Sequence, residues 1–198
     1  MKIIGITGAS GSGKTTASEI LNKRNDVRII DADKIAKSLN TPGTEYMKSI
    51  KNVFGESIFL KNGHLNRKEL AKVIYNDKSA REKLNGLTFK YVVDEILVKI
   101  EELKKLSINF IIIDAPLLIE SGLNKYCDFV IALIADDELK IKRICRRDNI
   151  DEETAKKRLK IQHDNSFYID NSDFYIENSE YYNLEDKINE ILDLEIRG

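Results

Sequence analysis

The sequence has few of the residues that build disulfide frameworks or metal centres. It contains two cysteines, Cys127 and Cys145, and two histidines, His64 and His163. The cysteines form no C-x-x-C pattern and have no histidine cluster near them, which argues against a disulfide scaffold or a zinc site and predicts two reduced thiols. Each histidine is isolated, so we expect surface or turn residues rather than metal ligands or catalytic groups.

Long apolar runs and an excess of one charge are also missing. No apolar run approaches the length of a membrane span, and the segment where a signal peptide would be cleaved carries a glycine-rich loop instead, so we expect a cytoplasmic protein. The 32 basic and 33 acidic residues give a formal net charge of −1. This balance predicts no general attraction to nucleic acid or to an acidic membrane, and any basic site must be local. No sequence pattern indicates a subunit interface, and we favour a monomer.

Short apolar segments alternate with helical patterns along the 198 residues. Because the apolar segments are rich in Ile, Val and Phe, they are typical of strands buried on both faces of a parallel sheet. The alternation predicts an α/β fold, a doubly wound parallel sheet of about five strands in a single domain of residues 1–198. The predicted strands are 2–7, 27–31, 109–114, 129–134 and 174–177, and the predicted helices are 15–23, 33–39, 137–146 and 184–194.

Two segments are longer than a simple crossover requires. The first, about residues 41–106, is expected to be a helical insert that holds a second substrate. The spacing of Asn66 and Glu69 is that of a capping box at the head of a helix. Its predicted elements are an amphipathic helix over 46–54, a hairpin around 60–64, a helix over 67–75 and a long helix over 85–106.

The second long segment, about residues 137–165, is rich in arginine. Arg143 and Arg147 are four residues apart, so they share one face of a helix, and Arg158 follows further on. One interpretation is a solvated surface whose arginines pair with neighbouring acids such as Asp148. The other is a lid that closes over a triphosphate and brings guanidinium groups to the transferred phosphoryl group, and we favour this one.

The strongest functional pattern is GASGSGKT, residues 8–15, which matches G-x-x-x-x-G-K-[ST] between a strand and a helix. Its glycines let the backbone wrap closely around an anion, and the following helix adds its positive end. Lys14 supplies a point charge for the outer phosphates, and the Thr15 hydroxyl can bind magnesium. The loop predicts binding of a nucleoside triphosphate.

Three carboxylates are candidates for the chemistry. Asp114 ends an apolar strand, as a Walker B aspartate does, where it would contact hydrated magnesium beside Thr15. The structural alternative for Asp114 is a helix cap or turn residue. Asp31 and Asp33 follow the second strand, and strand alternation predicts that both point the same way. Either one fits a base that accepts a proton from an attacking hydroxyl, and the residues alone do not choose between them.

Four further motifs follow the phosphate loop in order: DADKIA at 31–36, TPGT at 41–44, GHLNR at 63–67 and DAPLLIESGL at 114–123. Together they resemble the dephospho-CoA kinase family, and the resemblance extends to the ENS turn at 177–179. It implies a fold like that of the nucleoside-monophosphate kinases. It also implies transfer of the γ-phosphoryl group of ATP to the 3′-hydroxyl of the dephospho-CoA ribose, the final step of coenzyme A synthesis.

The resemblance also assigns roles to residues. It implies that Asp33 is the base and that Lys14 and Arg143 act in catalysis, with ATP, Mg²⁺ and dephospho-CoA as the bound molecules. Thr15 and Asp114 would serve the metal, the latter through water, and Asn178 falls where the family places a loop near adenine. The implied ATP-binding set is Gly8, Gly11, Ser12, Gly13, Lys14, Thr15, Thr16, Arg147, Arg158 and Asn178.

One departure and two alternatives remain. The family often has a Leu-His-Pro element entering the long helix, whereas this chain has LTFK at 87–90. A nucleoside or nucleoside-monophosphate kinase would share the layout but leaves the DAPLLIESGL motif unexplained. A GTP-dependent switch needs N-K-x-D, and the candidates NKRN at 22–25 and NKYC at 124–127 both lack the aspartate.

Overall fold

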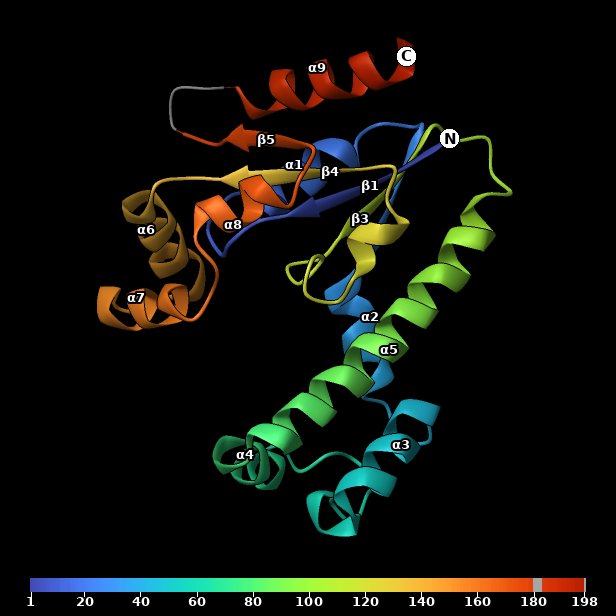
Figure 1. Ribbon diagram of the computed structural model, residues 1–198, viewed down its shortest axis with the longest axis vertical. Coiled ribbons are helices and arrows are strands. Elements are labelled where there is room, and N and C mark those ends of the chain that lie inside the picture. Colours follow the sequence, from blue (N-terminus) through green and yellow to red (C-terminus); the bar gives the residue numbers. More distant parts are fainter. Residues whose placement is uncertain (180–182, 198) are drawn as a thin grey trace. The chain divides into compact units, whose positions relative to one another are not determined.

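The computed structural model describes residues 1–179 and 183–197, and its central feature is one five-stranded sheet (Figure 1). The strand order is β2-β3-β1-β4-β5, and the pairs β1–β3, β1–β4 and β4–β5 are parallel. The predicted sheet is therefore confirmed, with the third strand starting one residue later than expected. The strands are β1 (Lys2–Thr7), β2 (Val27–Asp31), β3 (Phe110–Asp114), β4 (Phe129–Ile134) and β5 (Phe174–Glu177).

The helices α1 (Lys14–Leu21), α8 (Asn165–Asp170) and α9 (Leu184–Arg197) cover the sheet, and alternate residues of β4 show how. All six residues of β4 are buried. Ile131 and Leu133 join a core with side chains of α1 and α9, whereas Ala132 and Ile134 pack with Tyr168 of α8. Because successive strand residues face opposite sides, the sheet is covered on both faces, which explains its continuous apolar strands.

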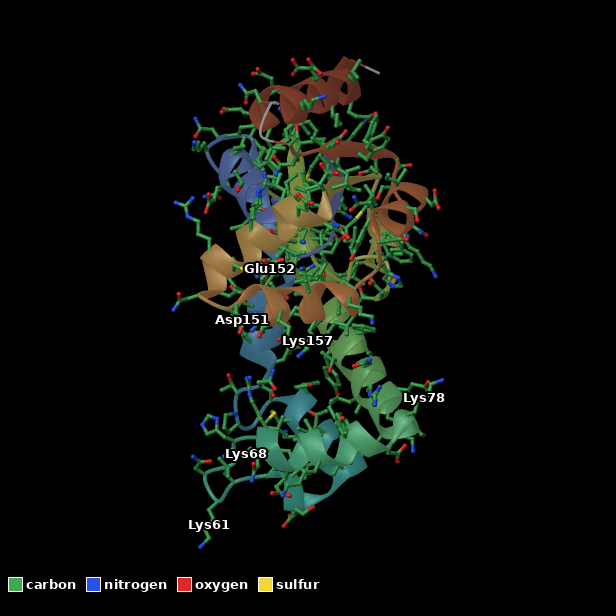
Figure 2. The ribbon with its side chains drawn as sticks, turned by 90° about the vertical axis from the view of Figure 1, so that its left-hand side faces the viewer. Lys61, Lys68, Lys78, Asp151, Glu152 and Lys157 are labelled. Atoms are coloured by element: carbon green, nitrogen blue, oxygen red, sulfur yellow. The ribbon has the colours of Figure 1, made fainter. Side chains whose placement is uncertain are left out.

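Two helices follow β4 and make up the segment predicted as a lid. Helix α6 (Asp137–Asp148) extends two residues beyond its predicted end and stops where Asn149 takes a left-handed conformation, with φ 51°. Helix α7 (Glu152–Lys160) begins after Asp151, whose side chain accepts a hydrogen bond from the Thr154 amide. Figure 2 shows Glu152 and Lys157 on α7 and Asp151 at its N-cap, and all three are exposed.

The chain forms two compact units, one made of residues 1–30 with 103–198 and the other of residues 31–102. The second unit contains most of the predicted insert and has its own core of Tyr46, Met47, Ile50, Ile58 and Leu70. Its surface carries exposed lysines such as Lys61, Lys68 and Lys78 (Figure 2). Its helices are α2 (Ala32–Leu39), α3 (Glu45–Phe54), the short 3₁₀ helix η1 (Glu56–Ile58), α4 (Arg67–Asn76) and α5 (Lys78–Leu103).

The long helix α5 begins seven residues before its predicted start at Asn85 and ends at Leu103 rather than Leu106. Its early start has a local cause, because the Asp77 carboxylate accepts a hydrogen bond from the Ala80 amide at 3.0 Å. The predicted hairpin is a tight turn in which Phe59 and Leu65 form an isolated antiparallel bridge. Half of the predicted capping box at α4 is confirmed: the Asn66 side chain accepts from the Glu69 amide, whereas the Glu69 carboxylate pairs with Lys72 and the Asn66 amide donates to the carbonyl of Ile58.

The strand order determines where a ligand can bind. Strand β1 lies between β3 and β4, so the chain leaves β1 and β3 toward opposite edges of the sheet. In open parallel sheets this reversal creates a crevice at the carboxyl ends of the strands. Residues 8–15 follow β1 at that point, Asp114 ends β3, and Asn178 follows β5.

Ile112 tests the contribution of this core, because it is fully buried in the middle of β3. We expect Ile112→Ala to lower the free energy of unfolding by about 2–5 kcal/mol, since the lost methylene groups leave a cavity in a close-packed sheet. Val98→Ala, at a side chain that is 55% exposed, should change it by less than about 0.5 kcal/mol. Urea unfolding followed by circular dichroism measures both, and an equal effect of the two substitutions would contradict this description of the core.

Candidate functional site

The phosphate loop takes a backbone path that needs its glycines. Gly11 and Gly13 have φ values of 81° and 108°, in the left-handed region that side chains avoid. A Cβ at Gly11 would lie 2.6 Å from the carbonyl oxygen of Lys140, and one at Gly13 would collide with the amide nitrogen of Asn178. Neighbouring elements therefore pack directly against the loop backbone, with room only for glycine.

Side chains bind the carbonyl oxygens of this loop. The Lys14 ammonium donates to the carbonyls of Gly8 and Ala9, at 2.5 and 3.0 Å. The Asn178 side-chain amide donates to the Ser12 carbonyl at 2.8 Å, and Asn178 is only 9% exposed. These contacts orient the peptide groups of the loop. Asn178, which the family resemblance placed near adenine, thus contacts the backbone of the phosphate loop.

The loop residues that follow present hydroxyl groups. Thr15 and Thr16 are exposed on the first turn of α1. Ser12 is fully buried, and its hydroxyl has no hydrogen-bond partner within the described part of the chain. An exposed hydroxyl at Thr15 beside a glycine cradle fits a magnesium–nucleotide complex, because Mg²⁺ prefers oxygen ligands and substrate phosphates.

Asp114 lies at the carboxyl end of β3, paired in register with Ile6 of β1. Its carboxylate accepts a hydrogen bond of 2.5 Å from the hydroxyl of Ser18 on α1. Ser18 was not predicted from the sequence, although it lies three residues after Thr15 and so shares its helix face. A carboxylate held beside this face supplies an oxygen ligand of the kind that Mg²⁺ takes through water.

Two predicted arginines of α6 contact the phosphate loop. Arg143 donates to the carbonyl of Gly11 and to the carbonyl of Asn178, each at 3.2 Å. Arg147, one turn later, donates to the hydroxyl of Ser10 at 3.2 Å. The shared helix face inferred from their spacing is confirmed, and it brings two guanidinium groups to the loop.

Arg147 also pairs with Asp148 at 2.7 Å, and Arg158 of α7 binds the same carboxylate at 2.7 Å. Arg147 therefore makes the ion pair with a neighbouring acid that the first interpretation expects, and it also contacts the phosphate loop. The hydrogen bond from Arg147 lowers the pKa of Asp148 below its ordinary value. A lowered carboxylate pKa means that the pairing is complete at neutral pH and is lost only as the pH falls through that pKa.

A buried lysine that the sequence did not reveal holds the start of α6. The side chain of Lys140 is 1% exposed, and its ammonium lies 2.7 Å from the Asp137 carboxylate and 3.0 Å from the side-chain oxygen of Asn165. Asn165 in turn donates to the carbonyl of Ala135 at 3.0 Å. Charged lysines are buried only when they are paired, and this one ties α6 to the start of α8.

The prediction that Asp31 and Asp33 point the same way is wrong. The strand ends at Asp31 and α2 starts at Ala32, so strand alternation no longer applies between them. Asp31 caps the helix by accepting from the Lys34 amide at 2.9 Å, and it also pairs with the Lys34 ammonium at 3.2 Å. Asp33 is exposed in the first turn of α2, and within the described residues its carboxylate has no hydrogen bond or ion pair.

Residues 87–90, where this chain lacks the family's Leu-His-Pro element, are helical. The stretch lies within α5, which continues through it because no proline interrupts the helix. Within this stretch Thr88 donates to the carbonyl of Leu84 at 2.8 Å and contacts the Tyr46 hydroxyl at 3.0 Å. Phe89 is half-buried. Thr88 therefore has a packing role within the second unit.

Comparisons with known proteins decide the family. The family model described as dephospho-CoA kinase matches residues 2–183. The chain belongs to the dephospho-CoA kinase family. A dephospho-CoA kinase of Fusobacterium nucleatum is 39% identical over 190 residues, which cover 96% of this chain and 94% of that relative. The resemblance inferred from the motifs is confirmed, and with it an enzyme that transfers phosphate from ATP.

Solved structures agree with this membership. The dephospho-CoA kinase from Campylobacter jejuni is 30% identical, with a TM-score of 0.67, and the alignment covers 97% of this chain and 96% of that one. A shikimate kinase from Acinetobacter baumannii, 17% identical with a TM-score of 0.56 over 100% of this chain and 94% of that one, shares the fold. The predicted P-loop kinase fold is therefore confirmed. No helix in the described part of the chain is long and apolar enough to cross a membrane.

The tight packing at Gly13 gives a direct test of the loop. We expect Gly13→Ala to abolish measurable ATP binding, because the new methyl group meets Asn178 and the backbone must keep a positive φ. Gly86→Ala is the matched control: Gly86 lies in α5 with nothing near its added Cβ, so alanine there should stabilise the helix by about 1 kcal/mol and leave ATP binding unchanged. Calorimetric titration with MgATP compares them, and normal affinity in Gly13→Ala would show that the loop tolerates a side chain.

Proposed function

We propose that this protein transfers the γ-phosphoryl group of ATP to the 3′-hydroxyl of the ribose of dephospho-CoA, giving CoA and ADP. Phosphoryl transfer is supported by one observation above all: two arginines, Arg143 and Arg147, contact the phosphate loop. Membership of the dephospho-CoA kinase family supports the acceptor. We further propose that the protein acts as a monomer in the cytoplasm and has no nucleic-acid or membrane partner.

The phosphates of ATP are proposed to bind in the loop of residues 8–15, on its backbone N–H groups and on the positive end of α1. Lys14 would release its contacts with loop carbonyls and bind the outer phosphates as a point charge. Thr15 and Asp114 would hold Mg²⁺, the latter through water. The metal supplies neutralisation of the phosphate charge.

The second unit, residues 31–102, is proposed to hold dephospho-CoA. Asp33 is proposed as the base in preference to Asp31, because the Asp31 carboxylate caps α2 and pairs with Lys34. The 3′-oxygen attacks the γ-phosphorus, the bond from that phosphorus to the β,γ-bridging oxygen breaks, and the hydroxyl proton passes to the Asp33 carboxylate. The electron pair of the broken bond leaves with ADP.

Charge and alignment provide most of the acceleration in this scheme. A ribose hydroxyl is a weak acid, so Asp33 orients it and takes its proton late. Arg143, on the carbonyls of Gly11 and Asn178, would shift toward the charge that spreads over the transferred group, and Arg147 and Arg158 would assist on the ATP phosphates.

The acceptor is tested by measuring ADP release from MgATP with dephospho-CoA, with nucleosides, with nucleoside monophosphates and with no acceptor. We expect turnover only with dephospho-CoA, and CoA as the product. Turnover with a nucleoside or nucleotide instead would overturn the acceptor. ADP release without any acceptor would point to a nucleotide-dependent switch or motor.

The role of Asp33 predicts a separation of binding from turnover. Asp33→Asn should bind ATP normally but lose roughly 10²–10⁴-fold in kcat, the usual contribution of a general base. Asp31→Asn is the matched control, and it should leave kcat near normal, because an asparagine oxygen can still accept from the Lys34 amide and only the exposed ion pair with the Lys34 ammonium is lost. Steady-state kinetics would remove Asp33 from the role if the Asp33 variant turned over at a near-normal rate.

Lys14 should behave differently from Asp33. Lys14→Ala removes a positive charge from the outer phosphates, so we expect both a higher Kd for ATP and a lower kcat. The Kd is measured by calorimetry and the kcat by the same ADP-release assay. An unchanged Kd would mean that the Lys14 ammonium remains on the loop carbonyls of Gly8 and Ala9 when nucleotide is bound.

A further inference from the structure

Gln162, in the short segment between α7 and α8, contacts the phosphate loop. The backbone N–H of Ser10 donates to the side-chain oxygen of Gln162 at 2.7 Å, although 152 residues separate them. This contact fixes the orientation of the side-chain amide. Because the peptide N–H is a donor, the amide oxygen must face Ser10, and the NH₂ group lies on the other side of the same carbon.

The backbone around Gln162 is held in place. Its own N–H donates to the carbonyl of Leu159, at the end of α7, at 3.0 Å. The next residue, His163, stacks its ring on that of Phe167 with centroids 3.6 Å apart. Asn165 is fixed by the buried Lys140 at 3.0 Å. The Gln162 amide is therefore presented to the loop from a supported backbone.

The contact belongs to a group of side chains that converge on the same turn of the loop. The hydroxyl of Ser10 accepts from Arg147, and the carbonyl of the next residue, Gly11, accepts from Arg143. Within the described residues the NH₂ group of Gln162 makes no hydrogen bond. It is thus a polar donor carried to a loop that binds anions, on a side chain whose other end is already attached there.

We propose that Gln162 is a further phosphate-binding residue, whose amide oxygen holds the Ser10 peptide while its NH₂ group donates to a phosphate oxygen in the loop. The inference rests on the proposed function, because it requires the phosphates of ATP to bind in residues 8–15. An amide suits both tasks, since it carries one acceptor and two donors on a single carbon. Neither a carboxylate nor an apolar side chain of the same length offers this combination.

Two substitutions separate this role from simple support of the loop. Gln162→Glu keeps the length and an acceptor for Ser10 but replaces the donor with a second, negatively charged oxygen. We expect the Kd for MgATP to rise by about tenfold to a hundredfold, because a hydrogen bond to a charged group is lost and like charges meet. Gln162→Met, which removes both functions without adding charge, should raise it by a smaller factor, about threefold to tenfold.

A residue that only held Ser10 would give the opposite order. At high ionic strength, where repulsion between the added carboxylate and the phosphates is screened, a charged acceptor still makes a stronger hydrogen bond to Ser10 than a neutral one, so Gln162→Glu would then bind MgATP at least as tightly as the unmodified protein. Calorimetric titration distinguishes the two orders. Ile161→Ala is the control, because Ile161 precedes Gln162 and is 86% exposed, and it should leave the Kd unchanged.

The outcomes of this titration separate the role of Gln162 from the proposed function. If the unmodified protein binds MgATP and Gln162→Glu binds it equally or more tightly, the inference fails and the proposed function stands. If the unmodified protein does not bind MgATP, the proposed function fails and the inference with it. Because Gln162 is exposed, we expect the variants to have the same midpoint of thermal unfolding as the unmodified protein. Should the Glu variant not fold, unchanged affinity in Gln162→Met overturns the inference alone.

Discussion

The site depends on the orientation of the peptide groups in the phosphate loop. The carbonyls of Gly8 and Ala9 are bound by Lys14, that of Gly11 by Arg143, and that of Ser12 by Asn178. With their carbonyls held by donors, the peptides of a loop are oriented before an anion arrives, so that their N–H groups can face it. This loop shape needs positive φ angles at Gly8, Gly11 and Gly13, which would strain any residue with a side chain but which glycine adopts readily.

These carbonyl contacts come from parts of the chain that the sheet brings together. Lys14 starts α1, Arg143 lies on α6 after β4, and Asn178 follows β5. Parallel strands all end at the same edge, so segments far apart in sequence meet around the loop that follows β1. The segment predicted as a lid thus contributes to the shape of the phosphate loop as well as to the charge around it, and Gln162 adds its contact with Ser10.

Much of the fold was predictable because its signals are local. Buried parallel strands read as apolar runs, and four of the five strands have the predicted bounds. Caps are also local, and Asn66 heads α4 as expected. Errors arose where a short-range contact overrode the pattern. Asp77 starts α5 early, and Asp31 begins a helix where an extended strand end was expected.

Motifs, periodicity and residue spacing were enough to predict the loop, the sheet, the family and the shared face of Arg143 and Arg147, because each of these signals is local in the chain. Some contacts around the site depend on the folded chain. Ser18 binds Asp114, Lys140 reaches Asn165 in addition to the nearby Asp137, and Gln162 binds Ser10, and no local sequence pattern indicates these distant partners. Such contacts form only when the folded sheet brings together segments that are far apart in sequence, so no local pattern can predict them.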